Sequence, residues 1–148
     1  MIGYITFRLA ERELACRLDE VREVVRLNGL EVLPGMTPPV SGLLELRGIP
    51  LPVIDLRAGD AESRRGMRGD VLVLADGVEA VGVVVDQVTA VHDEDDLKET
   101  GEDRASGLPH YVVDVLRRAS VGGAAVGGAA VGNPVLLVDL RRLMTVAA

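Results

Sequence analysis

The sequence predicts an all-β fold, built from small barrels rather than from a parallel sheet covered by helices. Apolar residues make up 48% of the 148-residue chain but aromatic residues only 2%, so valine, leucine and alanine must fill the core, and a valine-rich core favours strands. Apolar and polar residues alternate over short segments that are separated by turn signals. Many short strands joined by tight turns are typical of small β-barrels.

The first expected element is a hairpin over residues 4–18. Its apolar residues fall at every second position on both sides of a polar break, and these residues are Ile5, Phe7, Leu9, Leu14, Cys16 and Leu18. We place Cys16, the only cysteine, in the core as a small hydrophobic residue. A chain with one cysteine forms no internal disulfide, which suits a reducing cytoplasm.

A short helix is predicted next. Val21, Val24 and Val25 follow helical spacing, Asp19 is a suitable N-cap, and Gly29 is suited to end the helix.

The segment GLLELRGIPLPVIDLR, residues 42–57, places charged residues inside an apolar stretch. Because strand residues alternate, Leu44 and Leu46 are expected to face a core while Glu45 and Arg47 face away from it. Gly48 allows a tight turn and the close approach of a partner's backbone. The two prolines after Gly48 remove ladder donors, so the second strand is expected at an edge or with its donor side facing outward.

The rest of the chain continues the β pattern. A polar connector, residues 58–70, leads to a second hairpin around Asp76-Gly77, a dipeptide suited to a turn with positive φ. The acidic residues 92–99 are expected to form a solvated loop or the start of a short helix. Two last strands are predicted within residues 110–118 and 133–144, and the second runs into a C-terminal helix.

Residues 121–132 form a VGGAA repeat whose period of five matches neither a helix nor a strand. Ordering uncharged, glycine-rich sequence costs entropy, so the repeat is expected to be a flexible hairpin loop. It is interpreted either as an interaction loop or as an expanded turn. The second interpretation is favoured because loop length adds little to the free energy of closure.

Several classes of function are disfavoured. The net charge of −7 argues against a nucleic-acid backbone as partner. With two histidines and no zinc, phosphate-loop, GxSxG or EF-hand pattern, the chain offers no recognisable catalytic or metal set. Neither a signal peptide nor an uninterrupted apolar span outside the Gly/Ala repeat is recognised. We therefore expect a cytoplasmic binding protein that is not an enzyme and has no metal or cofactor.

The segment VSGLLELRGIPLPVIDLR, residues 40–57, resembles the core motif of CheW-like domains, the coupling proteins of bacterial chemosensory arrays. The residues that match this motif are Gly42, Leu46, Arg47, Gly48, Pro52, Val53, Asp55, Leu56 and Arg57. Further segments resemble the family in the same order over nearly the whole chain. They are the first hairpin, VREVVRL with Val21 and Glu23, the segment with Gly82 and Asp86, and the closing strand and helix.

The resemblance implies a single domain over residues 1–148, made of two five-stranded SH3-like barrel lobes that share a core, with one or two short helices. It implies an adaptor without enzymatic activity or cofactor. Such an adaptor ties a CheA-type histidine kinase to the cytoplasmic tips of methyl-accepting receptors, with the receptor tip in the groove between the lobes. It would be cytoplasmic and recruited to membrane-proximal arrays, without inserting into the membrane.

The resemblance and the strand alternation together suggest two sets of site residues. The expected partner-binding residues are Val21, Glu23, Gly42, Glu45, Arg47 and Gly48, and the expected structural residues are Pro52, Asp55, Gly82 and Asp86. Arg47 can donate to carboxylates or carbonyls of a docking helix, or it can pair internally with Asp55; the two roles are compatible.

Two departures from the family pattern leave alternatives open. Glu45 stands where the family has an asparagine, and Asp114 stands where a glycine is usual. One alternative is therefore a divergent adaptor that has lost its kinase or its receptor interface. A further alternative is an SH3-like barrel acting as a nucleic-acid or ribosome accessory, which the acidic charge disfavours.

Overall fold

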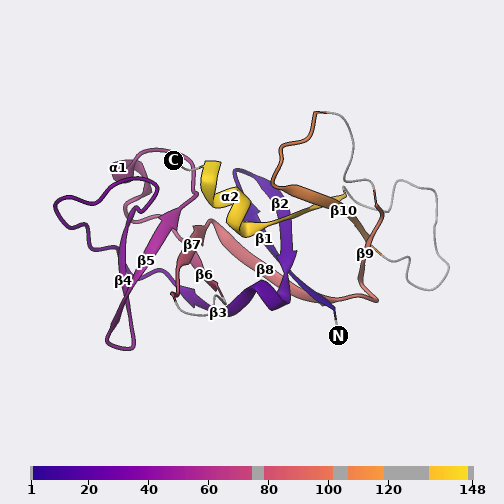
Figure 1. Ribbon diagram of the computed structural model, residues 1–148, viewed down its shortest axis with the longest axis horizontal. Helices are drawn as coiled ribbons and strands as arrows, with labels where there is room; N and C mark the ends of the chain where they lie inside the picture. The colour runs from indigo at the N-terminus through magenta and orange to yellow at the C-terminus, as the bar shows by residue number, and fades with distance from the viewer. Residues whose placement is uncertain (1, 75–78, 102–106, 119–133, 147–148) are drawn as a thin grey trace.

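The computed structural model describes residues 2–74, 79–101, 107–118 and 134–146 (Figure 1). In chain order the elements are β1 (Gly3–Leu9), β2 (Arg12–Arg17), the 3-10 turn η1 (Leu18–Glu20), β3 (Val21–Arg26), β4 (Gly42–Leu46), β5 (Ile49–Asp55), α1 (Ala61–Arg64), β6 (Asp70–Leu74), β7 (Gly82–Val85), β8 (Gln87–Asp93), β9 (Leu97–Glu99), β10 (Val112–Arg118), β11 (Val135–Val138) and α2 (Leu140–Val146). The all-β prediction is confirmed.

The strands form two sheets, one for each lobe. The first sheet has five strands in the order β3-β6-β7-β5-β4, and the second has six in the order β8-β1-β2-β11-β10-β9. Figure 1 shows β4 and β5 at one end of the long axis and β9 and β10 at the other. The two-lobe prediction is confirmed, and the second sheet carries one strand more than expected.

One hydrophobic cluster joins the two lobes. It contains Ile5, Phe7 and Cys16 from the six-stranded sheet together with Leu72 and Leu74 from β6 of the other sheet. Alternate residues of the same strands face clusters inside each lobe: Tyr4 of β1 in the six-stranded lobe, and Val71 and Val73 of β6 in the five-stranded lobe, so β6 is apolar on both faces. The lobes therefore share a core. Within it Cys16 is fully buried, and burial raises the pKa of its thiol.

The helix predicted between Asp19 and Gly29 is wrong. Residues 21–26 form β3, which pairs antiparallel with β6, as in the pairing of Val25 with Val71. Half-buried and exposed residues alternate along β3, although the spacing of its valines also fits a helix. Tertiary context decides between the two patterns, because β3 supplies the hydrogen-bonding partner that β6 needs on this side and β-branched valine suits a strand.

Other expectations have mixed outcomes. The second hairpin is present as the antiparallel pair β6–β7, although its turn at residues 76–77 lies outside the described residues. The VGGAA repeat at residues 121–132 also lies outside them. The acidic segment is neither a plain loop nor a helix, because β8 extends to Asp93 and β9 begins at Leu97, whose side chain is fully buried.

The closing elements agree with the sequence. Strands β10 and β11 pair antiparallel, and α2 follows β11 after one residue. None of the helices in the described part of the chain is long and apolar enough to cross a bilayer.

Candidate functional site

The turn between β4 and β5 carries the predicted contact residue Arg47. Leu46 pairs with Ile49 across the turn, so Arg47 and Gly48 are its two central residues. Their φ angles are +49° and +81°, both in the left-handed region, as a two-residue hairpin turn that follows the strand twist requires. Glycine adopts this conformation without cost, whereas arginine does not.

The hairpin extends beyond the sheet, as Figure 1 shows. Strand β5 pairs with β7 only from Val53 to Asp55, whereas its first residues pair with β4 alone. Pro50 and Pro52 lie in this one-sided part, where no second neighbour needs their missing donors. The prolines therefore occupy a local edge, although β5 is an inner strand of the sheet as a whole.

Arg47 forms a two-pronged ion pair with Glu23 of β3. Its Nη1 donates to Glu23 Oε1 at 2.9 Å and its Nη2 to Glu23 Oε2 at 2.8 Å. These hydrogen bonds lower the pKa of Glu23 and raise that of Arg47. The Arg47 side chain remains 69% exposed, and that of Glu23 is 25% exposed. Two predicted contact residues that lie far apart in the sequence thus meet at one exposed point.

This ion pair also bridges the two edges of the five-stranded sheet. Strands β3 and β4 are its opposite edges, yet Glu23 of β3 reaches the turn that follows β4. Near the other end of β4, Glu31 and Leu43 exchange backbone hydrogen bonds of 2.9 and 2.8 Å. Strand β3 and the loop after it therefore reach the β4 edge at two points, which closes the lobe as a barrel.

The internal pairing of Arg47 with Asp55 is wrong, because Asp55 pairs with Arg57. Arg57 Nε donates to Asp55 Oδ1 at 3.0 Å and its Nη2 to Oδ2 at 2.7 Å, and both side chains are only 3% exposed. Arg57 Nη1 also donates to the carbonyls of Met67 and Arg68. This buried pair satisfies its own charges and fastens the connector before β6 to the end of β5.

The remaining expected contact residues line the same two edges. Val21 is half-buried and packs against the shared core. Gly42 is buried, and a Cβ there would lie 3.0 Å from the Glu31 carbonyl oxygen. Glu45 is exposed beside the turn and forms no hydrogen bond or ion pair with the described residues.

Gly82 and Asp86 lie away from this turn and make structural contacts. A Cβ on Gly82 would lie 2.7 Å from Val71 Cγ1 and 2.8 Å from Val53 Cγ1, so only glycine fits between these strands. Asp86 Oδ2 accepts a hydrogen bond from Ala10 N at 2.9 Å. Asp86 therefore braces the turn between β1 and β2, where Ala10 and Glu11 both have positive φ.

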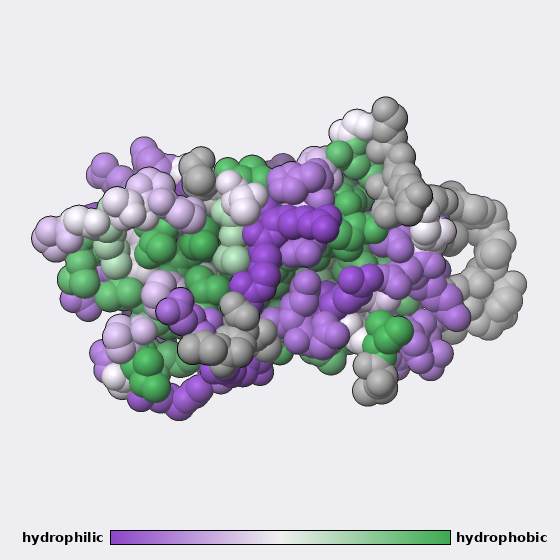
Figure 2. All heavy atoms as spheres, viewed as in Figure 1, coloured by the Kyte–Doolittle hydropathy of each residue, from purple (hydrophilic) through white to green (hydrophobic). Residues whose placement is uncertain are grey.

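The surface around the turn is partly apolar. Ile49, directly after Gly48, is 68% exposed. Figure 2 shows an apolar patch at the tip of the β4–β5 hairpin and hydrophilic residues over the middle of the same face. A fixed guanidinium beside an exposed apolar side chain is a composition found at protein interfaces.

Sequence reasoning missed two features. One is the buried partner of Asp55, which the spacing of Asp55 and Arg57 on one strand face would have suggested. The other is a group of arginines around a pocket, for which the segment SRRGMR, residues 63–68, was the signal. Among the described residues, no group of three or more His, Cys, Asp or Glu side chains is placed to hold a metal ion.

Comparison with known proteins gives one family and one fold. The model of the CheW-like domain family matches residues 3–148. Among solved structures, the chain is similar to the scaffolding protein TtCheW from Thermoanaerobacter tengcongensis, with a TM-score of 0.60 and 19% sequence identity over 94% of this chain and 84% of that one. No curated protein sequence matches the chain.

Proposed function

The chain belongs to the CheW-like domain family, and from this premise we propose that it is a non-enzymatic adaptor that couples methyl-accepting receptors to a CheA-type histidine kinase. The observation that carries the proposal is the family match over residues 3–148, which includes both lobes and supports a role as an adaptor in chemotaxis. TtCheW is described as a scaffolding protein, which agrees with that role.

The proposed receptor contact is the surface around Arg47 and Glu23. The exposed guanidinium is held in one orientation by two hydrogen bonds, so little side-chain entropy is lost when a partner binds. Ile49 adds exposed apolar area that a docking helix can cover. Glu45, exposed and without a partner among the described residues, would add specificity for a basic or polar group at the rim.

Removing Arg47 tests the receptor contact. A fragment of a receptor's cytoplasmic tip is titrated by calorimetry into the wild type and into Arg47→Ala, with Arg12→Ala as the matched control. Arg12 is an exposed arginine on β2, in the other lobe. We expect at least tenfold weaker binding for Arg47→Ala and unchanged binding for the control, as for an arginine at the centre of an interface.

The result also separates the alternatives. Unchanged affinity of Arg47→Ala would remove Arg47 from the receptor interface. A wild type that captures the kinase but not the receptor fragment would favour the divergent adaptor, with Glu45 as the first residue to exchange for asparagine. A chain that captures neither partner would contradict the adaptor function.

A further inference from the structure

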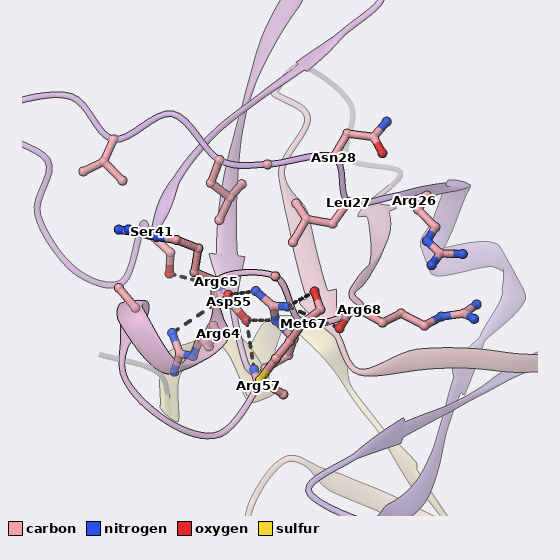
Figure 3. Close-up of a pocket in the computed structure, with 15 residues that line it drawn as sticks. Arg26, Leu27, Asn28, Ser41, Asp55, Arg57, Arg64, Arg65, Met67 and Arg68 are labelled. Atoms are coloured by element: carbon pink, nitrogen blue, oxygen red, sulfur yellow. Dashed lines mark hydrogen bonds and ion pairs between the residues drawn. The ribbon is translucent and has the colours of Figure 1, made fainter.

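A pocket of about 680 Å³ opens in the five-stranded lobe (Figure 3). Its walls come from the end of β3 and the loop after it, the end of β5, α1, and the segment between α1 and β6. The volume lies in the range that is usual for small-molecule sites. None of the proposed receptor-contact residues lines the pocket, so a ligand could bind there whether or not the chain is an adaptor.

The pocket is strongly basic in an acidic protein. Its lining includes five arginines and one carboxylate, Asp55, whereas the whole chain has a net charge of −7. Asp55 is already neutralised by Arg57. The positive charge that remains comes from the other four arginines, which are Arg26, Arg64, Arg65 and Arg68.

These four guanidinium groups are poorly neutralised by the protein. The side chains of Arg26 and Arg65 are exposed, and their guanidinium groups form no hydrogen bond or ion pair with the described residues. Arg64 Nη1 lies 3.9 Å from Asp55 Oδ2, an oxygen that Arg57 already occupies, and its buried Nε has no hydrogen-bond partner in the described part of the chain. Arg68 has a partner, Asp70, at 3.5 Å. Donors are therefore available around the pocket.

Hydrogen bonds from neighbouring residues hold the segment that carries Arg64, Arg65 and Arg68 in place. The Arg57 guanidinium is fixed by Asp55 and donates to the carbonyls of Met67 and Arg68 at 3.1 and 3.2 Å. Asp60 caps α1 by accepting from Ser63 N at 2.8 Å. Figure 3 shows Arg57 and Asp55 at the centre of this network, with Arg26 and Arg68 extending toward the same side of the view.

We propose that this pocket binds a small organic anion with at least two negative charges. Guanidinium groups pair with the oxygens of phosphates and carboxylates in a two-pronged geometry, and several of them around one cavity select multiply charged ligands. Leu27 and Met67 in the lining offer apolar contact for the carbon part of such a ligand. The volume favours a small molecule over a polypeptide or a nucleic acid, which would need a longer groove.

Binding of two probe anions tests the proposal. Pyrophosphate and citrate are titrated by calorimetry at fixed ionic strength into the wild type, into the double variant Arg26→Gln/Arg65→Gln, and into Arg22→Gln. Arg22 is an exposed arginine on the same strand as Arg26 and does not line the pocket. We expect at least one probe to bind the wild type, at least tenfold weaker binding to the double variant, and unchanged binding to Arg22→Gln.

Each outcome has a consequence. Binding of pyrophosphate alone identifies a phosphate ligand and binding of citrate alone a carboxylate ligand, and either supports the proposal. No binding of either probe overturns it. Equal loss in Arg22→Gln and in the double variant also overturns it, because it would show a general charge effect. Binding of a polyglutamate peptide together with no binding of the small anions would assign the surface to an acidic polypeptide instead.

Discussion

Arg47 occupies a backbone conformation that costs stability. Its φ of +49° is unfavourable for a residue with a Cβ, and its ion pair with Glu23 is mostly exposed to solvent, where such pairs contribute little. Glycine or asparagine would satisfy the turn better. Strained residues of this kind cluster at functional positions, which agrees with the proposed contact role of Arg47.

A comparison of two substitutions measures this strain. Arg47→Gly and Arg47→Ala both remove the guanidinium, but only the glycine variant also relieves the positive φ. We expect Arg47→Gly to melt at a higher temperature than Arg47→Ala and at no lower a temperature than the wild type. Identical melting temperatures for the two variants would show that the turn is not strained at this residue.

Glu20 is a second residue that lowers the stability of the fold, and it makes that stability depend on pH. Burial, followed by the charge of Asp139, raises the pKa of Glu20, and its Oε2 is buried without a hydrogen-bond partner in the described part of the chain. A raised pKa in the folded state means that the fold favours the protonated form. The resulting stabilisation is present below the unfolded pKa and is lost as the pH rises through the folded pKa.

Glu20→Gln should therefore raise the melting temperature at pH 7, because the amide stays uncharged. The advantage over the wild type should shrink as the pH falls through the raised folded-state pKa of Glu20, and it should be gone below about 4.3, where the carboxyl is protonated in the folded and the unfolded state. Melting curves at several pH values, with Glu79→Gln at an exposed carboxyl that does not act on Glu20 as control, provide the measurement. A Glu20→Gln variant less stable than the wild type at pH 7 would contradict the assignment.

Among the elements, β3 shows where local patterns stop being decisive. Its sequence VREVVR fits a helix through the spacing of Val21, Val24 and Val25, and it fits a strand through the alternation that the structure adopts. The choice depends on β6, a strand more than 40 residues later in the chain, with which β3 pairs. The sequence around β3 therefore carries no information about its partner strand β6.

The contact between β5, β6 and β7 depends on the absence of a side chain at Gly82. The φ of Gly82 lies outside the left-handed region, so an alanine there would meet only a steric obstacle, the methyl groups of Val71 and Val53. We expect Gly82→Ala to cost about 1–3 kcal/mol, as overpacking of cores does. Urea unfolding of the wild type and of Gly82→Ala measures this loss of stability.

Gly48→Ala is the matched comparison for this prediction. Nothing lies within 4 Å of a Cβ built at Gly48, but its φ is +81°, so its cost is conformational and not steric. A compensating mutation distinguishes the two causes: Val71→Ala should partly restore Gly82→Ala and should not restore Gly48→Ala. A urea midpoint of Gly82→Ala equal to that of the wild type would mean that the strands separate without loss.

For the molecule as a whole, the sequence predicted the architecture better than the site. Short alternating segments and continuous apolar runs such as VLVL, residues 71–74, indicate strands buried on one or both faces, and they led to an all-β fold of small barrels. The division into two lobes came from the resemblance to CheW-like domains. The joining of Glu23 to Arg47 could not be predicted, because it depends on barrel closure, which brings opposite sheet edges together. Arg57 was visible in the motif, but its burial was not.

The same limit applies to the basic pocket. Three of its arginines are close together in the segment 63–68, but Arg26 comes from β3, and only the fold adds it to the group. The net charge is a sum over the whole chain, so it describes the chain as acidic and gives no sign of this local excess of positive charge. Features that depend on distant segments meeting are therefore the ones that sequence patterns miss.

The adaptor function requires that the chain bring the kinase and the receptor together, so this is the property to measure. Vesicles that display a receptor's cytoplasmic domain are sedimented with a CheA-type histidine kinase from the same organism, with and without this chain, and the fraction of kinase in the pellet is measured. If the chain is an adaptor, kinase should enter the pellet only when the wild-type chain is present. The fraction of kinase in the pellet should be strongly reduced when the Arg47→Ala variant replaces the wild-type chain. The same fraction of kinase in the pellet with and without the chain would contradict the adaptor function.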